Sequence, residues 1–153
     1  MGLVDFIRAA GEKIFGASEA AAAPTTDEAV LSKRATALEE HVRGLGLVVE
    51  GLKIKVADEV AHVKGTVATQ AVREKVVLAV GNVTGIAKVD DRLEVTNPEP
   101  EARYYTVLKG DTLSKIAKAE YGDANKYPQI FEANKPMLKH PDKIYPGQVL
   151  RIP

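Results

Sequence analysis

The spacing of hydrophobic residues predicts an ordered series of helices and strands in the middle of the chain. Apolar residues recur at helical spacing beyond Thr25 and Thr26, either of which is expected to cap the helix, and Gly44 and Gly46 are expected to end it. The apolar face consists of Val30, Leu31, Leu38, Val42 and Leu45. A helix is therefore predicted from about residue 27 to residue 44.

Period-two alternation follows this helix. Leu52, Ile54 and Val56 alternate with lysines, which predicts a half-buried strand, and a turn at Asp58 and Glu59 is expected to lead into a returning strand. Thr69 is expected to cap a second helix that ends at Gly81 in a left-handed conformation, and a last strand is predicted from residue 86 to residue 95. This order predicts an α+β layer with helices on one face of a small sheet.

The residue pattern of the C-terminal third predicts a separate series of strand, helix, helix and strand. A strand at residues 104–107 precedes a glycine turn, and Asp111 or Thr112 is expected to cap the next helix. A second helix is predicted from Ala124 to Asn134 and a closing strand from Val149 to Ile152. All five tyrosines and seven of the eight prolines lie beyond Val95, so the composition changes abruptly at residues 96–102. We therefore expect two cores joined by a short linker.

The first fifteen residues carry apolar side chains at helical spacing, interrupted by charged residues. The apolar positions are Leu3, Phe6, Ile7, Ala10 and Ile14. This pattern predicts a short amphipathic helix over residues 1–16 rather than a secretory signal, which needs an unbroken apolar run. An alanine-rich linker is expected at residues 17–26. We therefore expect a cytoplasmic protein, and no apolar stretch is long enough for membrane insertion.

Composition and motifs argue against several functions. Lysine plus arginine and aspartate plus glutamate number 21 each, so no overall field favours nucleic acid as a partner. The chain has no cysteine, and its three histidines are far apart in the sequence. Asp90 and Asp91 are adjacent, but neighbours on a strand point to opposite faces and would not share a proton. We expect no enzymatic activity.

Specific motifs resemble two known families. The segments VADEVAHVKGTV and GNVTGIAKVDDRLEV resemble the BON family over residues 27–96, although Glu59 stands where the family commonly has glycine. The segments YTVLKGDTLSKIA, IFEAN and YPGQVLRIP resemble the LysM family over residues 103–153. The resemblance implies an α-β-β-α-β BON domain, a linker at residues 97–102 and a β-α-α-β LysM domain.

The combination resembles the family of bacterial cytosolic potassium-binding proteins, through the segments AGEK, AVGN, FEANKPMLK and PDKIYPGQVLRIP. This resemblance implies a K⁺ ion, held by backbone carbonyls, in a monomeric protein that becomes more compact and stable on binding. By resemblance the ligands are the carbonyls of Ile7, Ala10, Glu12, Gly81, Val83 and Ile86. Such a site is physically reasonable, because a helix that ends near Gly11 would expose unsatisfied carbonyls.

The residues also allow two alternative interpretations. Gly11 and Gly81 could be ordinary helix ends, and Gly85 an ordinary turn residue. The LysM family binds glycans that contain N-acetylglucosamine, such as peptidoglycan, so the resemblance also implies a glycan groove. Its residues here would be Gly110, Asp111, Thr112, Leu113, Asn134, Ile144, Tyr145 and Gly147.

Overall fold

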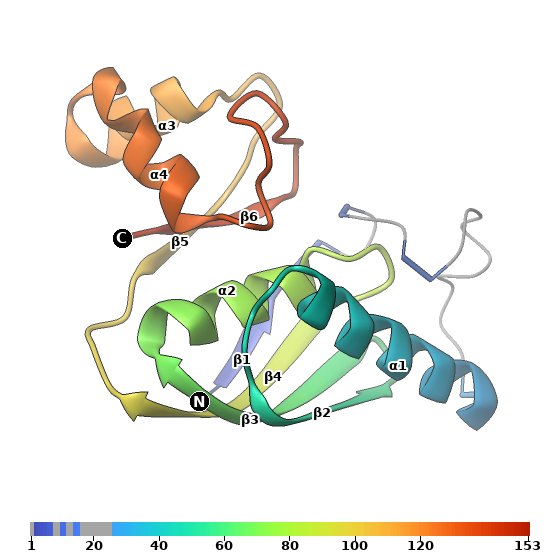
Figure 1. Ribbon diagram of the computed structural model, residues 1–153. Coiled ribbons are helices and arrows are strands. Elements are labelled where there is room, and N and C mark those ends of the chain that lie inside the picture. The colour runs from blue at the N-terminus through green and yellow to red at the C-terminus, as the bar shows by residue number, and fades with distance from the viewer. Residues whose placement is uncertain (1, 8–9, 12–13, 16–25) are drawn as a thin grey trace.

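A four-stranded sheet with two helices on one face forms the larger unit of the computed structural model (Figure 1). The structure describes residues 2–7, 10–11, 14–15 and 26–153. The N-terminal unit contains β1 (Gly2–Asp5), α1 (Glu28–Gly44), β2 (Glu50–Ala57), β3 (Val60–Thr69), α2 (Gln70–Gly81) and β4 (Lys88–Asn97). Its strands lie in the order β1-β4-β3-β2, with β3 and β4 parallel and the other pairs antiparallel. The α+β class and the α-β-β-α-β order are thus confirmed.

The predicted caps and turns are correct in most places. Thr69 caps α2 through a bond from the Val72 amide to its hydroxyl oxygen (3.2 Å), and Asp58 makes the β2–β3 turn with a φ of 54°. The predicted N-cap of α1 is wrong. Asp27, rather than Thr25 or Thr26, caps the helix by accepting the Ala29 amide at 2.9 Å. A carboxylate also interacts favourably with the positive end of the helix dipole.

The prediction of an N-terminal helix is wrong over Gly2–Asp5. These residues form strand β1 along the free edge of β4. Burial follows a strand period: Leu3, Asp5 and Ile7 are exposed, whereas Phe6 is buried and Val4 is half-buried. A short isolated helix is only marginally stable in water, while an unpaired sheet edge offers backbone partners. The Phe6 amide extends the pairing by donating to the Ala87 carbonyl at 2.8 Å. The predicted linker at residues 17–26 lies outside the described residues, except for Thr26.

The C-terminal unit confirms the β-α-α-β order. It contains β5 (Arg103–Thr106), α3 (Leu113–Tyr121), the 3-10 helix η2 (Ala124–Lys126), α4 (Tyr127–Ala133) and β6 (Val149–Ile152). Thr112 caps α3 through the Lys115 amide, and Gly122 ends it with a φ of 77°. Strands β5 and β6 pair in antiparallel fashion. No helix within the described ranges combines the length and hydrophobicity that a bilayer span requires.

Each unit has its own hydrophobic core, but the two cores touch. The N-terminal core lies between the sheet and helices α1 and α2, and the C-terminal core lies between α3, α4 and the β5–β6 pair. Val149 of β6 belongs to the N-terminal core, and Met137 packs against both. The C-terminal unit therefore sits on the helical side of the first unit, beside α2 (Figure 1).

Candidate functional site

The N-terminal segment after β1 lies against the α2–β4 loop, residues 82–87. A Cβ atom added to Gly11, whose φ is 111°, would lie 2.5 Å from the carbonyl carbon of Asn82. The Thr84 hydroxyl donates to the Gly11 carbonyl at 3.0 Å. Two backbones approach this closely only where a side chain is absent, so Gly11 is required for the contact.

Gly81 also allows the N-terminal segment to lie close to the end of α2. It is the last residue of α2 and not a left-handed residue beyond the helix, which corrects the sequence prediction. A Cβ atom on Gly81 would overlap the buried ring of Phe6. Glycine is needed here because the far edge of the Phe6 ring lies against the end of α2, where it packs the N-terminal segment onto the loop.

The predicted carbonyl ligands fall on these two facing segments. Ile7 and Ala10 come from the N-terminal segment, and Gly81, Val83 and Ile86 come from the end of α2 and its loop, whereas Glu12 lies outside the described residues. The carbonyl of Ile7 accepts the Ala10 amide at 3.0 Å, and that of Val83 accepts the Ile86 amide at 3.1 Å. A carbonyl oxygen has two lone pairs, so each retains capacity for a cation. The ligand set itself stays a prediction.

The C-terminal unit closes over the same loop through Asn82. The Asn82 side chain donates to the Val149 carbonyl and accepts the Val149 amide, both at 2.8 Å, and is 5% exposed. It thereby pairs with β6 as a neighbouring strand would. On the other side of the junction, a Cβ atom on Gly147 would lie 2.7 Å from the Cβ atom of Ala10. The N-terminal segment, the α2–β4 loop and the start of β6 therefore meet at one place.

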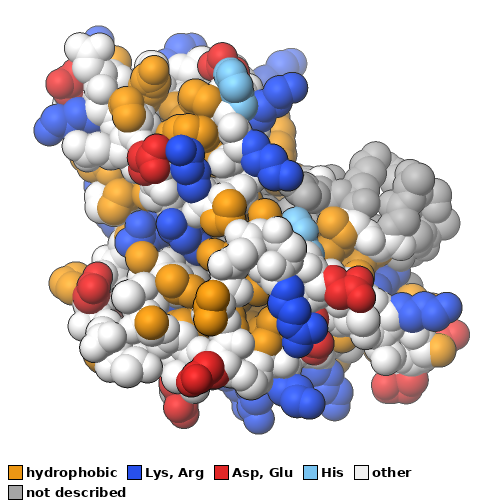
Figure 2. All heavy atoms as spheres, in the orientation of Figure 1, with side chains coloured by type: hydrophobic (Ala, Val, Ile, Leu, Met, Phe, Trp, Pro, Cys, Tyr) orange, Lys and Arg blue, Asp and Glu red, His pale blue; other side chains and the backbone are white. Residues whose placement is uncertain are grey.

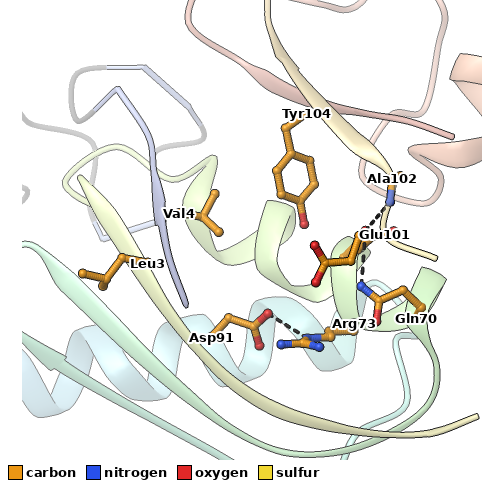
Figure 3. Close-up of a pocket in the computed structure, with 9 residues that line it drawn as sticks. Leu3, Val4, Gln70, Arg73, Asp91, Glu101, Ala102 and Tyr104 are labelled. Carbon is orange, nitrogen blue, oxygen red and sulfur yellow. Dashed lines mark hydrogen bonds and ion pairs between the residues drawn. The ribbon is translucent and has the colours of Figure 1, made fainter. Parts of the chain in front are cut away.

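A second junction, centred on buried Glu74 of α2, joins the two units. Its carboxylate accepts the Arg151 guanidinium at 2.7 Å and the Ala102 amide at 2.9 Å. A hollow of about 140 Å³ lies beside it, with Arg73 paired to Asp91 at 2.8 Å, and the Tyr104 hydroxyl points into this hollow (Figure 3). Partial burial, followed by the charges of Glu74 and Asp91, raises the pKa of Tyr104. The Tyr104 hydroxyl therefore keeps its proton to a higher pH than an ordinary tyrosine does.

The predicted glycan groove consists largely of residues with structural roles. Asn134 is buried and bonds to the backbone of Ile130 and Arg151, while Leu113 lies in the C-terminal core. Asp111 accepts the Tyr105 hydroxyl at 2.6 Å and the Leu108 amide at 2.9 Å, so it holds the turn before α3. The Tyr105 bond lowers the pKa of Asp111, and Asp111 raises the pKa of Tyr105 to about 12.

The remaining groove residues lie in two surface loops. Gly110 and Thr112 flank Asp111, and Ile144, Tyr145 and Gly147 come from the loop before β6. The Gly147 amide donates to the Val107 carbonyl at 2.8 Å, which brings this loop beside the end of β5. The N-terminal segment abuts Gly147 and therefore occupies part of the surface that a glycan would need.

Sequence reasoning missed the residues that join the segments. Asn82 lies between two predicted ligands, and the available signal was an asparagine directly after a helix. Nothing in the sequence indicated that its partner is Val149, 67 positions away. Thr84 and Glu74 carried no distinctive pattern either, and Phe6 was interpreted as part of a helical apolar face. The partners of these residues lie in other elements, and hydrophobic periodicity does not identify contacts between elements.

Comparisons with known proteins agree with this architecture. Residues 27–97 match the family model of the BON domain, and residues 105–153 match that of the LysM domain. An uncharacterized protein of Deinococcus radiodurans is 53% identical over 49 residues, or 32% of this chain and 19% of that protein. An esterase of Mycobacterium tuberculosis is 47% identical over 53 residues, or 35% of this chain and 11% of that protein.

One relative matches over the whole length. The potassium binding protein Kbp of Escherichia coli is 47% identical over 154 residues, which cover 100% of this chain and 99% of that protein. The match spans both domains, the segment before them and the linker between them. The chain therefore belongs to the family of this potassium binding protein, with a BON domain followed by a LysM domain.

Proposed function

We propose that this protein is a non-enzymatic, cytoplasmic potassium sensor that binds K⁺ through backbone carbonyls of the N-terminal segment and the α2–β4 loop. The observation that carries the proposal is the close approach of Gly11 to the Asn82 and Val83 backbone, held by Thr84. It brings the two predicted ligand segments together in a chain whose full-length relative is named a potassium binding protein.

The chemistry of the junction suits a large monovalent cation. Clustered neutral carbonyl dipoles can replace the hydration shell of K⁺, whereas Ca²⁺ and Mg²⁺ favour carboxylate ligands. Within the described ranges, no group of three or more His, Asp or Glu side chains is placed to hold a metal ion. A backbone site is therefore the kind of cation site that these residues could build.

The same junction offers a route from ion binding to compaction. Asn82 lies between the predicted ligands Gly81 and Val83, and its side chain holds β6 of the LysM domain. An ion that orders the loop would also orient the Asn82 amide toward Val149. Binding would therefore favour the docked arrangement of the two domains by a shift of population.

Thermal unfolding in matched potassium and sodium chloride tests the proposal. An ion that binds only the folded state adds about 2.7 kcal/mol at a hundredfold excess over Kd, or roughly 5–10 °C in melting temperature. We expect this increment in potassium and a much smaller one in sodium. Equal melting temperatures in the two salts would overturn the proposal.

Matched glycine variants locate the site. Gly85 has a φ of 107° in the loop, and Gly46 has a φ of 76° at the end of α1 with open space around it. Both Gly85→Val and Gly46→Val introduce backbone strain and should lower stability, because β-branched residues disfavour positive φ. Only Gly85→Val should also reduce the increment specific to potassium. Deleting residues 1–13 should abolish that increment while the LysM core remains folded.

The LysM match favours glycan binding as a second candidate function. Sedimentation with peptidoglycan, with chitooligosaccharides as competitors, tests it. We expect no sedimentation above that of a control protein, because the N-terminal segment lies against Gly147. Saturable binding that the oligosaccharides compete away would support the glycan function instead. Cell fractionation tests the cytoplasmic location directly.

A further inference from the structure

The face of the sheet that α1 and α2 leave open carries an aligned set of cations. Lys53 of β2 pairs in register with Lys64 of β3, and Lys64 pairs with Arg92 of β4, so three cations cross the sheet in one row. Lys55 lies in the next row, beside His62 and Asp90. All four cationic side chains are exposed, and blue side chains gather along the lower edge of the molecule, beneath these strands (Figure 2).

This alignment is unfavourable for the fold by itself. Like charges directly opposite each other on neighbouring strands repel, and here two successive strand pairs bring them together. Among the described residues, no carboxylate forms an ion pair with Lys53, Lys55 or Lys64. Asp90 is shared between Arg92 at 2.9 Å and His62 at 2.8 Å. A row of cations with this little compensation suits an anionic ligand.

The four cationic side chains line a hollow of about 540 Å³, together with His62, Ile54 and Ala57. This volume lies within the usual range of small-molecule sites, roughly 300–1,000 Å³. Neighbouring strands are about 4.8 Å apart, so the row of three cations extends over about 10 Å. These dimensions match a short chain of phosphate groups.

Acidic residues border the cationic rows and limit the size of the ligand. Glu50 and Glu94 both pair with Thr66 in the next row along the strands. Asp58 lies beyond the other end, in the β2–β3 turn, and Asp5 lies on β1 opposite Lys88. A nucleic-acid strand or a membrane surface would extend over these carboxylates and meet repulsion. A compact anion would avoid these bordering carboxylates, and Asp90, the carboxylate within the rows, is already paired with Arg92 and His62.

We propose that the open face of the BON sheet binds a soluble anion with two or more phosphate groups, through Lys53, Lys55, Lys64 and Arg92. Lysine provides point charges, and the Arg92 guanidinium can make paired hydrogen bonds to a phosphate. The site is separate from the proposed potassium junction, because these side chains lie on the face of the sheet opposite α2. Neither proposal depends on the other.

Calorimetric titration of the full-length protein with sodium tripolyphosphate tests the site, in a fixed potassium concentration and at matched ionic strength. We expect saturable binding that weakens as salt increases, and much weaker binding of sodium sulfate. The triple variant K53Q/K55Q/K64Q should bind tripolyphosphate at least about tenfold more weakly, since it loses three charge-assisted contacts. Its melting temperature should not fall, because repulsion between strands is removed.

A charge-matched control is the triple variant K33Q/K118Q/K126Q, which removes three exposed lysines from α1, α3 and η2. We expect its affinity for tripolyphosphate to stay within about twofold of that of the unmodified protein, because screening weakens distant charges. Equal losses in both triple variants would overturn the proposal, since they would report net charge alone. Binding to vesicles that contain anionic phospholipid, without binding of tripolyphosphate, would also overturn it by indicating a lipid surface as the occupant.

Discussion

At the scale of single residues, hydrogen bonds in the turn before α3 make stability depend on pH. The Tyr105 hydroxyl and the Leu108 amide hold the pKa of Asp111 below its ordinary value of 3.8. A lowered folded pKa contributes stability that is fully present above pH 3.8 and is lost as the pH falls through the folded value. Asp111→Asn should therefore destabilise the protein at neutral pH, and the difference should shrink in acid. Urea unfolding at a series of pH values measures it, and a difference that is constant with pH would contradict this origin.

At the scale of elements, Asn82 connects the end of α2 to strand β6. Its replacement by alanine leaves the buried amide and carbonyl of Val149 without these partners. Unsatisfied buried groups cost about 1–3 kcal/mol each, so we expect Asn82→Ala, which leaves two of them, to lower the free energy of unfolding by at least about 2 kcal/mol. Denaturant unfolding measures this change. The exposed Asn125, replaced by alanine, is the control and should stay within about 0.5 kcal/mol of the unmodified protein.

The potassium response adds a second measurement on the same variant. If Asn82 transmits ion binding to the LysM domain, Asn82→Ala should retain a potassium-dependent increase in stability but lose the compaction that solution scattering detects. Compaction of Asn82→Ala equal to that of the unmodified protein would show that the domains dock without this contact.

At the scale of the whole molecule, two cores share a docked interface. The fragment from Arg103 to Pro153 retains its own cluster of buried residues, including Ile116, Ile130 and Leu150. It loses the partners of Val149 and Arg151, which are Asn82 and Glu74. We expect the fragment to fold alone, as circular dichroism would show, but to melt below the same domain in the full-length chain. A disordered spectrum would mean that the LysM core depends on the BON domain.

Most elements of this protein are determined by local sequence pattern. The alternation of Leu52, Ile54 and Val56 states which side of β2 is buried, and the threonines Thr69 and Thr112 fix the starts of α2 and α3. Such signals work because side-chain period and capping involve residues a few positions apart. The motifs that resemble the BON and LysM families lie on these same elements, so the sequence also indicated the family.

The contacts of each buried face depend on packing between elements that are distant in the chain. Residues 2–5 have apolar neighbours at helical spacing, yet they form a strand because the edge of β4 supplies backbone partners. Gly81 ends α2 as the pattern predicts, but glycine is required there by the Phe6 ring and not by a left-handed conformation. The junction of Gly11, Asn82 and Val149 joins residues far apart in the chain, and the cation row of Lys53, Lys64 and Arg92 depends on the register of three strands. Hydrophobic periodicity indicates which face of a helix or strand is buried. Strand register and packing determine which residues that face contacts.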